Sequence, residues 1–180
     1  MYMKNLILIR PSEAYHDEIQ DYRQELLAYD DHSHGESFLY ETADISQWIE
    51  NCRLYENKKT VPHPEHVEAD QFMLVYEGDK RILGMINFRH SLDNPYLFEQ
   101  GGHIGYGIRP LERRKGYATI MLALCLKKCR GYGLDKVLVC CAPDNLGSKK
   151  TILACGGVFE RMAYTDDGDE ADERYWIDLS

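Results

Sequence analysis

The sequence lacks the marks of a membrane protein and of a general nucleic-acid-binding protein. No apolar run approaches the roughly 20 residues that a membrane span needs, and the apolar stretch 6–9 is too short for a signal peptide. Lysine and arginine number 21 against 30 aspartates and glutamates, which gives a formal net charge of −9. This charge disfavours binding to nucleic acid or to an anionic membrane surface and suits cationic partners such as amines.

The sequence also lacks a C-x-x-C pair and any regular disulfide spacing. Its cysteines are Cys52, Cys125, Cys129, Cys140, Cys141 and Cys155. Most of them lie in apolar stretches, which is typical of buried thiols in a reducing compartment, so we predict a cytoplasmic protein. The histidine pairs 32/34 and 63/66 lie in loops, and no cysteine or carboxylate completes a ligand set beside them. We therefore predict no metal site.

Hydrophobic periodicity predicts an α/β fold. Helices are expected at 15–26, 45–55, 116–130 and 148–155, and strands at 6–10, 72–76, 82–88, 103–109, 137–142, 159–164 and 174–179. This order predicts a mixed, mostly antiparallel central sheet with helices on both faces. We expect a single domain over residues 1–180, because no repeat or linker divides the chain.

A basic loop between a strand and a helix carries the clearest chemical signal. Pro110 ends the strand, Arg113, Arg114 and Lys115 follow, and the helix begins near Gly116. Unpaired backbone N–H groups at the helix start, the helix dipole and the nearby cations together predict an anion site. A glycine here lets the backbone approach a phosphate closely. The spacing is neither that of a Walker loop nor G-x-G-x-x-G.

Residues 113–118 match the pattern Q/R-x-x-G-x-G/A. With the strand before it, and an amphipathic helix, an apolar strand and an Asn after it, this segment resembles the GNAT superfamily of acyl-CoA-dependent N-acetyltransferases. The resemblance is specific over residues 102–159 and loose over the N-terminal half. It implies acetyl-CoA as the acyl donor, bound by Ile108, Arg109, Arg113, Arg114, Lys115, Gly116, Tyr117, Ala118, Thr119, Asn145 and Ser148.

Two glycines, Gly105 and Gly107, lie on one face of the strand before the basic loop. Glycine weakens a strand, so its presence needs a reason. One reason is a β-bulge without any ligand. The other follows from the resemblance, in which the pantetheine arm of the cofactor lies along this strand.

The resemblance implies direct attack of an amine on the thioester in a ternary complex, with a base and an acid. His103 is the candidate base, because it lies near the start of the glycine-bearing strand and its titration range suits the task. The alternatives are that this histidine only caps the sheet, or that Glu99 serves. The tyrosine that protonates the thiolate in many relatives is Ile152 here. Other tyrosines that could serve are Tyr106, Tyr117, Tyr164 and Tyr175, and Tyr175 is the candidate acid.

These observations predict an enzyme that acetylates a primary amine of a small molecule. The alternatives are a protein or peptide N-acetyltransferase and a CoA-binding regulatory module without turnover. The resemblance also allows a homodimer. An acidic turn, residues 166–173, either recruits a cationic amine or is a solvated hairpin tip.

Overall fold

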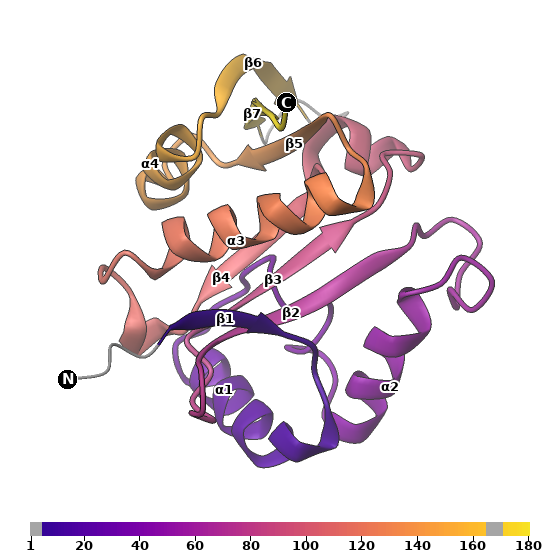
Figure 1. Cartoon of the computed structure of the whole chain (residues 1–180), viewed down its shortest axis with the longest axis vertical. Coiled ribbons are helices and arrows are strands. Elements are labelled where there is room, and N and C mark those ends of the chain that lie inside the picture. Colours follow the sequence, from indigo (N-terminus) through magenta and orange to yellow (C-terminus); the bar gives the residue numbers. More distant parts are fainter. Residues whose placement is uncertain (1–4, 165–170) are drawn as a thin grey trace.

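The computed structural model describes residues 5–164 and 171–180, which form two antiparallel sheets and their covering helices (Figure 1). The first sheet has the order β1 (Leu6–Ile9), β2 (Ala69–Tyr76), β3 (Gly84–Arg89), β4 (Ile104–Ile108). The second has the order β5 (Lys136–Cys141), β7 (Ala171–Asp178), β6 (Val158–Tyr164). The predicted α/β fold is confirmed, with the difference that the strands divide into two sheets.

Four α-helices lie close to their predicted positions. They are α1 (His16–Ala28), α2 (Ile45–Tyr55), α3 (Tyr117–Tyr132) and α4 (Leu146–Ala154). Short turns of other helix types are η1 (Glu13–Tyr15), η2 (Leu97–Gly101) and η3 (Pro110–Glu112). Of these, the π-helical turn η2 was not predicted, because five residues are too few to show a helical period.

The helices cover both faces of the first sheet. On one face, α1 and α2 pack with Met73 and Val75 of β2 in a core that includes Trp48. On the other face, α3 packs with Phe72 and Leu74 of the same strand. Successive side chains of a strand point to opposite faces, so this alternation places β2 between two cores. In Figure 1 the pair α1 and α2 and the second sheet lie at opposite ends of the molecule.

One histidine joins the two sheets. The backbone N–H of His103 donates to the carbonyl oxygen of Leu138 at 2.8 Å, and the N–H of Leu138 donates to His103 Nδ1 at 2.9 Å. Among the described residues β4 and β5 do not pair as strands of one sheet beyond this point. The edge of β4 that faces β5 is therefore left open. No helix within residues 5–164 and 171–180 combines the length and apolarity needed to cross a bilayer.

Candidate active site

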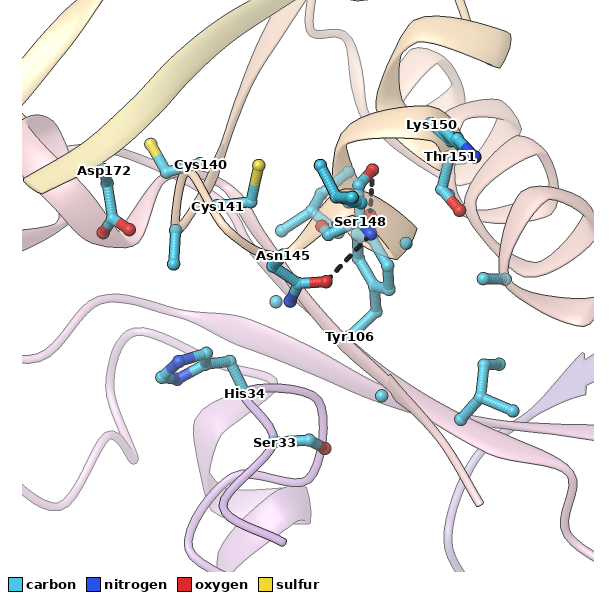
Figure 2. A pocket seen from close by; sticks show the side chains of 18 of the residues that line it. Ser33, His34, Tyr106, Cys140, Cys141, Asn145, Ser148, Lys150, Thr151 and Asp172 are labelled. Carbon is cyan, nitrogen blue, oxygen red and sulfur yellow. Dashed lines mark hydrogen bonds between the residues drawn. The ribbon is translucent and has the colours of Figure 1, made fainter. Parts of the chain in front are cut away.

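A pocket of about 830 Å³ runs along β4. Its walls are the loop 31–34 on one side and the end of β5 with the start of α4 on the other (Figure 2). One end is lined by Arg113, Arg114 and Gly116, and the opposite end by Arg89 and Tyr96. This volume lies within the range that proteins use for small-molecule and cofactor sites.

The basic turn at the start of α3 is open to a ligand. Gly116 has φ +83°, and a Cβ added there would meet no protein atom within 4 Å. Arg114 is exposed, has φ +63°, and forms no ion pair within the described part of the chain. Arg113 also lines the pocket, although its guanidinium is paired with Asp31. A helix start and an unpaired cation are the features that suit a turn to an anionic ligand.

Several other residues that the sequence assigned to the cofactor line the same pocket. They are Ile108, Ala118, Thr119, Asn145 and Ser148. The side chain of Asn145 caps α4, since its Oδ1 accepts from the Ser148 N–H at 3.1 Å (Figure 2). The cap satisfies a backbone N–H in the first turn of α4, beside the pocket.

Three predicted cofactor residues point elsewhere. Arg109 is 4% exposed and bonds the carboxylates of Glu18 at 2.5 Å and Glu25 at 2.7 Å, so its side chain supports α1 instead of the pocket. Lys115 donates to Glu112 at 2.8 Å, and the hydroxyl of Tyr117 lies 3.2 Å from that of Tyr76. Neither Lys115 nor Tyr117 is among the residues that line the pocket.

Gly105 and Gly107 make room for the loop that covers β4. A Cβ at Gly105 would lie 2.1 Å from the carbonyl oxygen of His34, and one at Gly107 would lie 1.9 Å from Ser33 Oγ. The pairing of β3 with β4 is regular across both glycines, so they do not mark a bulge. Close approach of the loop, which the sequence did not suggest, is the reason for these two glycines.

The loop carries a buried carboxylate behind its serine. Ser33 Oγ lies 2.6 Å and 2.7 Å from the two carboxylate oxygens of Glu36, which is 2% exposed. Burial raises the pKa of Glu36 to about 7, against hydrogen bonds from Ser33 and the backbone that lower it. Trp48 of α2 fixes the loop, because its Nε1–H donates to the Glu36 carbonyl at 3.0 Å. Sequence analysis missed this pair, whose only local signal is a carboxylate three residues after a serine.

A pair of hydroxyl groups lies on the other side of the pocket from the loop. The hydroxyl of Tyr106 is 2.8 Å from Ser148 Oγ, and both side chains line the pocket. Burial raises the pKa of Tyr106 well above its ordinary value, so the phenol stays protonated at neutral pH. In Figure 2, Ser33 and His34 lie on one side of the pocket, and Asn145 and Ser148 lie on the other. Tyr106 is one of the alternative acids that the sequence offered.

The structure does not bring the two predicted catalytic residues to the pocket. His103 is 6% exposed, its Nδ1 is used by Leu138, and burial, with the charge of Arg89, lowers its pKa to about 4. Tyr175 is 1% exposed and donates to Glu173 at 2.5 Å, and burial with this bond raises its pKa to about 12. Neither lines the cavity.

The remaining predicted groups have other partners. Glu99, the second candidate base, is paired with Arg161 at 2.7 Å on the surface. No group of three or more metal-ligating side chains occurs among the residues that the structure describes. Within the acidic turn, residues 166–170 lie outside the described part, whereas Asp172 lines the pocket and Glu173 is paired with Lys149 at 2.7 Å.

The sequence model of the acetyltransferase (GNAT) domain matches residues 5–158. The chain belongs to the GNAT acetyltransferase family. This match covers most of the chain. It confirms the resemblance to the GNAT superfamily and the prediction of an acyltransferase. At the level of full-length sequence, no curated protein matches this GNAT protein.

Solved structures share the fold at low identity. The ribosomal-protein-S5-alanine acetyltransferase of Vibrio fischeri is 16% identical with a TM-score of 0.69, covering 100% of this chain and 96% of that one. The microcin C7 self-immunity acetyltransferase MccE, solved with acetyl-CoA and AMP, is 18% identical with a TM-score of 0.68, covering 96% and 92%. A spermidine N-acetyltransferase chimera of Vibrio cholerae SpeG and hSSAT is 16% identical with a TM-score of 0.60, covering 97% and 95%. The acceptors named for these proteins differ, so the shared fold does not fix the acceptor.

Proposed function

We propose that this GNAT enzyme transfers the acetyl group of acetyl-CoA to a primary amine of a small molecule by direct attack. The observation that carries the proposal is one continuous pocket with an anion site at one end and two hydroxyl groups, Ser33 and Ser148, on facing walls. The loop 31–34 walls the pocket on the side away from α4, which favours a small acceptor over a folded protein surface.

The donor fits along the open edge of β4. The N–H of Arg109 donates to the carbonyl oxygen of Leu83, the residue before β3, at 2.9 Å, which sets the alternation of hydrogen bonds along β4. In an antiparallel pair, residues alternate between bonding the partner and facing away from it, so the amides of Tyr106 and Ile108 face β5. We propose that these amides bond the pantetheine arm and that one of them polarises the thioester carbonyl. The phosphates then lie at the basic turn with Arg114 and Gly116.

The pair Ser33 and Glu36 is suited to remove the amine proton. The acceptor amine is an ammonium ion at neutral pH and must lose a proton before it attacks. Glu36 reaches the pocket only through the hydroxyl of Ser33, because it does not line the pocket itself. We propose that the ammonium proton passes to Ser33 Oγ as the serine proton passes to Glu36. A carboxylate with a pKa of about 7 accepts a proton well at physiological pH.

The pair Tyr106 and Ser148 is suited to supply a proton to the leaving group. The neutral amine forms its C–N bond to the acetyl carbon, the C–S bond breaks, and the electron pair leaves on sulfur. The nitrogen then releases its second proton, which replaces the one that a hydroxyl gives to the sulfur. A hydroxyl proton from Tyr106 or Ser148 converts this thiolate to the thiol of CoA, and the two hydroxyls share a hydrogen bond of 2.8 Å. This pair takes the place of the tyrosine that is absent at Ile152, which is fully buried in the core.

Calorimetric titration of acetyl-CoA tests the donor site. Gly116→Asp puts a negative charge and a side chain where the phosphates are proposed to lie, and we expect it to abolish measurable binding. Gly133→Asp is the matched control, because Gly133 ends the same helix, also has a positive φ of +107°, and also has no atom near an added Cβ. Equal binding by both variants and by the wild type would contradict the site. Turnover of any amine then excludes a module without activity.

A further inference from the structure

Arg89, at the end of β3, adds a cation to the end of the pocket opposite the basic turn. Its Nη1 donates to the carbonyl oxygens of Gly101 and Gly102 at 2.8 Å and 3.2 Å. Its Nη2 lies 3.0 Å from the place where a Cβ of Gly105 would be, which puts the guanidinium against β4. Among residues 5–164 and 171–180, no carboxylate pairs with it and Nη2 has no hydrogen-bond partner.

The positive charge of Arg89 is unfavourable in free energy unless an anion pairs with it. Burial lowers the pKa of Arg89, and no carboxylate acts to raise it again. An ion held in the protein without a counter-ion loses hydration free energy that only a partner of opposite charge restores fully. Arg109, which directly follows β4 and is also buried, has two carboxylates at hydrogen-bond distance. Arg89 instead has open space beside it, since it lines the pocket together with Tyr96 and Gln100.

Arg89 lies at the end of β4 that is farther from the basic turn. Its backbone N–H donates to the carbonyl of His103, just before β4 begins, whereas the turn with Arg114 follows the end of β4. The five residues between them span about 17 Å at the rise of an extended strand. A pyrophosphate bound at the turn therefore does not reach Arg89, and Arg89 remains available to a different anionic group.

We propose that Arg89 binds an anionic group of the acceptor, so that the substrate is an amine that also carries a carboxylate or a phosphate. The proposal rests on the acetyl transfer proposed above. A guanidinium recognises both oxyanions through paired N–H groups, and Arg89 lines the cavity with Nη2 free of hydrogen bonds to the described residues. The hydroxyl of Ser33, on the covering loop against Gly107, lies two residues along β4 from Gly105, where the guanidinium packs. One end of the acceptor would then be held at Arg89 while its amine reaches the proton-accepting pair.

Steady-state kinetics with matched acceptors tests this proposal. Each pair differs only in the anionic group: an α-amino acid with its carboxamide, and an aminoalkyl phosphate with its amino alcohol. We expect the wild type to prefer an anionic member in kcat/KM. Arg89→Gln should lower kcat/KM for that member about 10- to 100-fold and change the neutral member by less than about threefold. Whichever pair shows the loss identifies the oxyanion as carboxylate or phosphate.

Two further variants separate a recognition role from a folding role. Arg89→Lys keeps the charge and is expected to keep part of the preference for the anionic acceptor. Arg53→Gln, on the exposed face of α2, is the control and should behave as the wild type. Acetyl-CoA binding by calorimetry should stay within about twofold of wild type in all three variants, which also reports that they are folded.

Three results would overturn the assignment. Equal losses of kcat/KM on anionic and neutral acceptors would mean that Arg89 only bonds the carbonyls of Gly101 and Gly102. A change in preference between acetyl-CoA and succinyl-CoA, without a change among acceptors, would mean that the carboxylate belongs to the acyl group. Acetyl-CoA binding with turnover of neutral amines alone would refute an anionic acceptor while the proposed acetyl transfer stands. Failure of the proposed transfer itself is recognised separately, because the wild type would then acetylate neither anionic nor neutral acceptors.

Discussion

The hydroxyl of Ser33 stands between the carboxylate of Glu36 and the backbone of β4. It lies 2.6 Å from the nearer carboxylate oxygen, and its Oγ occupies space that a side chain at Gly107 would need. A glycine in the strand, a serine in the loop and a buried carboxylate thus depend on one another. The proton pathway proposed above requires that the strand have no side chain at this point.

Replacement of Glu36 tests the pathway. We expect Glu36→Gln to lower kcat about 10²- to 10⁴-fold, which is the usual contribution of a general base. In the wild type the rate should fall as the pH drops below about 7, where Glu36 becomes protonated. This fall is the acidic limb of the pH–rate profile, and the variant should lose it. Glu41→Gln, on the exposed part of the same loop, is the control. A variant with wild-type rates and an unchanged limb would remove Glu36 from the mechanism.

Removal of the serine hydroxyl should shift the same limb. The hydrogen bond from Ser33 lowers the pKa of Glu36, so Ser33→Ala should move the acidic limb of the pH–rate profile to higher pH. The rate at its plateau should fall as well, because the carboxylate loses its connection to the pocket. Pre-steady-state measurement of the acetyl-transfer step across pH 5–9 would show both effects. A limb that stays in place would mean that another group titrates there.

The buried carboxylate should also cost stability. The pKa of Glu36 is about 7 in the folded chain and 4.5 in its ordinary range, so between these values the folded state holds more protons than the unfolded state. Stability therefore falls as the pH rises from about 4.5 to 7, by about 3 kcal/mol in total. The difference in free energy of unfolding between Glu36→Gln and wild type should grow over this window in favour of glutamine. Parallel stability curves for the two proteins would contradict this expectation.

Local sequence pattern was sufficient for most of the fold. The helical spacing of Ile19, Tyr22 and Leu26 predicts α1, and all three side chains are fully buried. The basic turn could also be recognised, because it depends on neighbours only a few residues away.

The parts of the site that could not be predicted depend on contacts between residues far apart in the sequence. Arg109 follows the pocket strand directly, but Glu18 and Glu25, more than 80 residues earlier, hold its guanidinium. Ser33 meets Gly107 only because the chain folds its covering loop back onto β4. No periodicity encodes either contact. The charge of Arg109 therefore suggested a cofactor ligand, and the glycines suggested a bulge or a cofactor arm along the strand.

We expect His103 to stabilise the fold and not to act as the catalytic base. Its Nδ1 accepts the N–H of Leu138, so His103→Leu leaves a buried donor unpaired and should lower the free energy of unfolding by about 1–3 kcal/mol. His103→Asn offers an oxygen acceptor and should lose less. With a pKa of about 4, the ring is neutral at physiological pH, and the limb of the pH–rate profile near 7 should remain in both variants. Loss of that limb in a folded variant would restore His103 as the base.

Arg114 combines a proposed role in binding acetyl-CoA with backbone strain. Its φ of +63° is unfavourable for any residue with a Cβ, and such strain is retained mainly at functional sites. Arg114→Ala and Arg114→Gly both remove the charge, so both should weaken acetyl-CoA binding by about tenfold. The glycine variant should be more stable than the alanine variant by about 1 kcal/mol, because only glycine adopts this φ freely.

The neighbouring lysine provides the control for Arg114. The Lys115 ammonium is turned towards Glu112 and away from the pocket, so Lys115→Ala should change acetyl-CoA affinity much less than Arg114→Ala. Calorimetric titration at two salt concentrations separates the two roles, because the loss in Arg114→Ala should shrink as salt screens the phosphate contact. Equal losses in the two variants would mean that the loop acts through its overall charge. The orientation of one guanidinium would then not explain the binding of the donor.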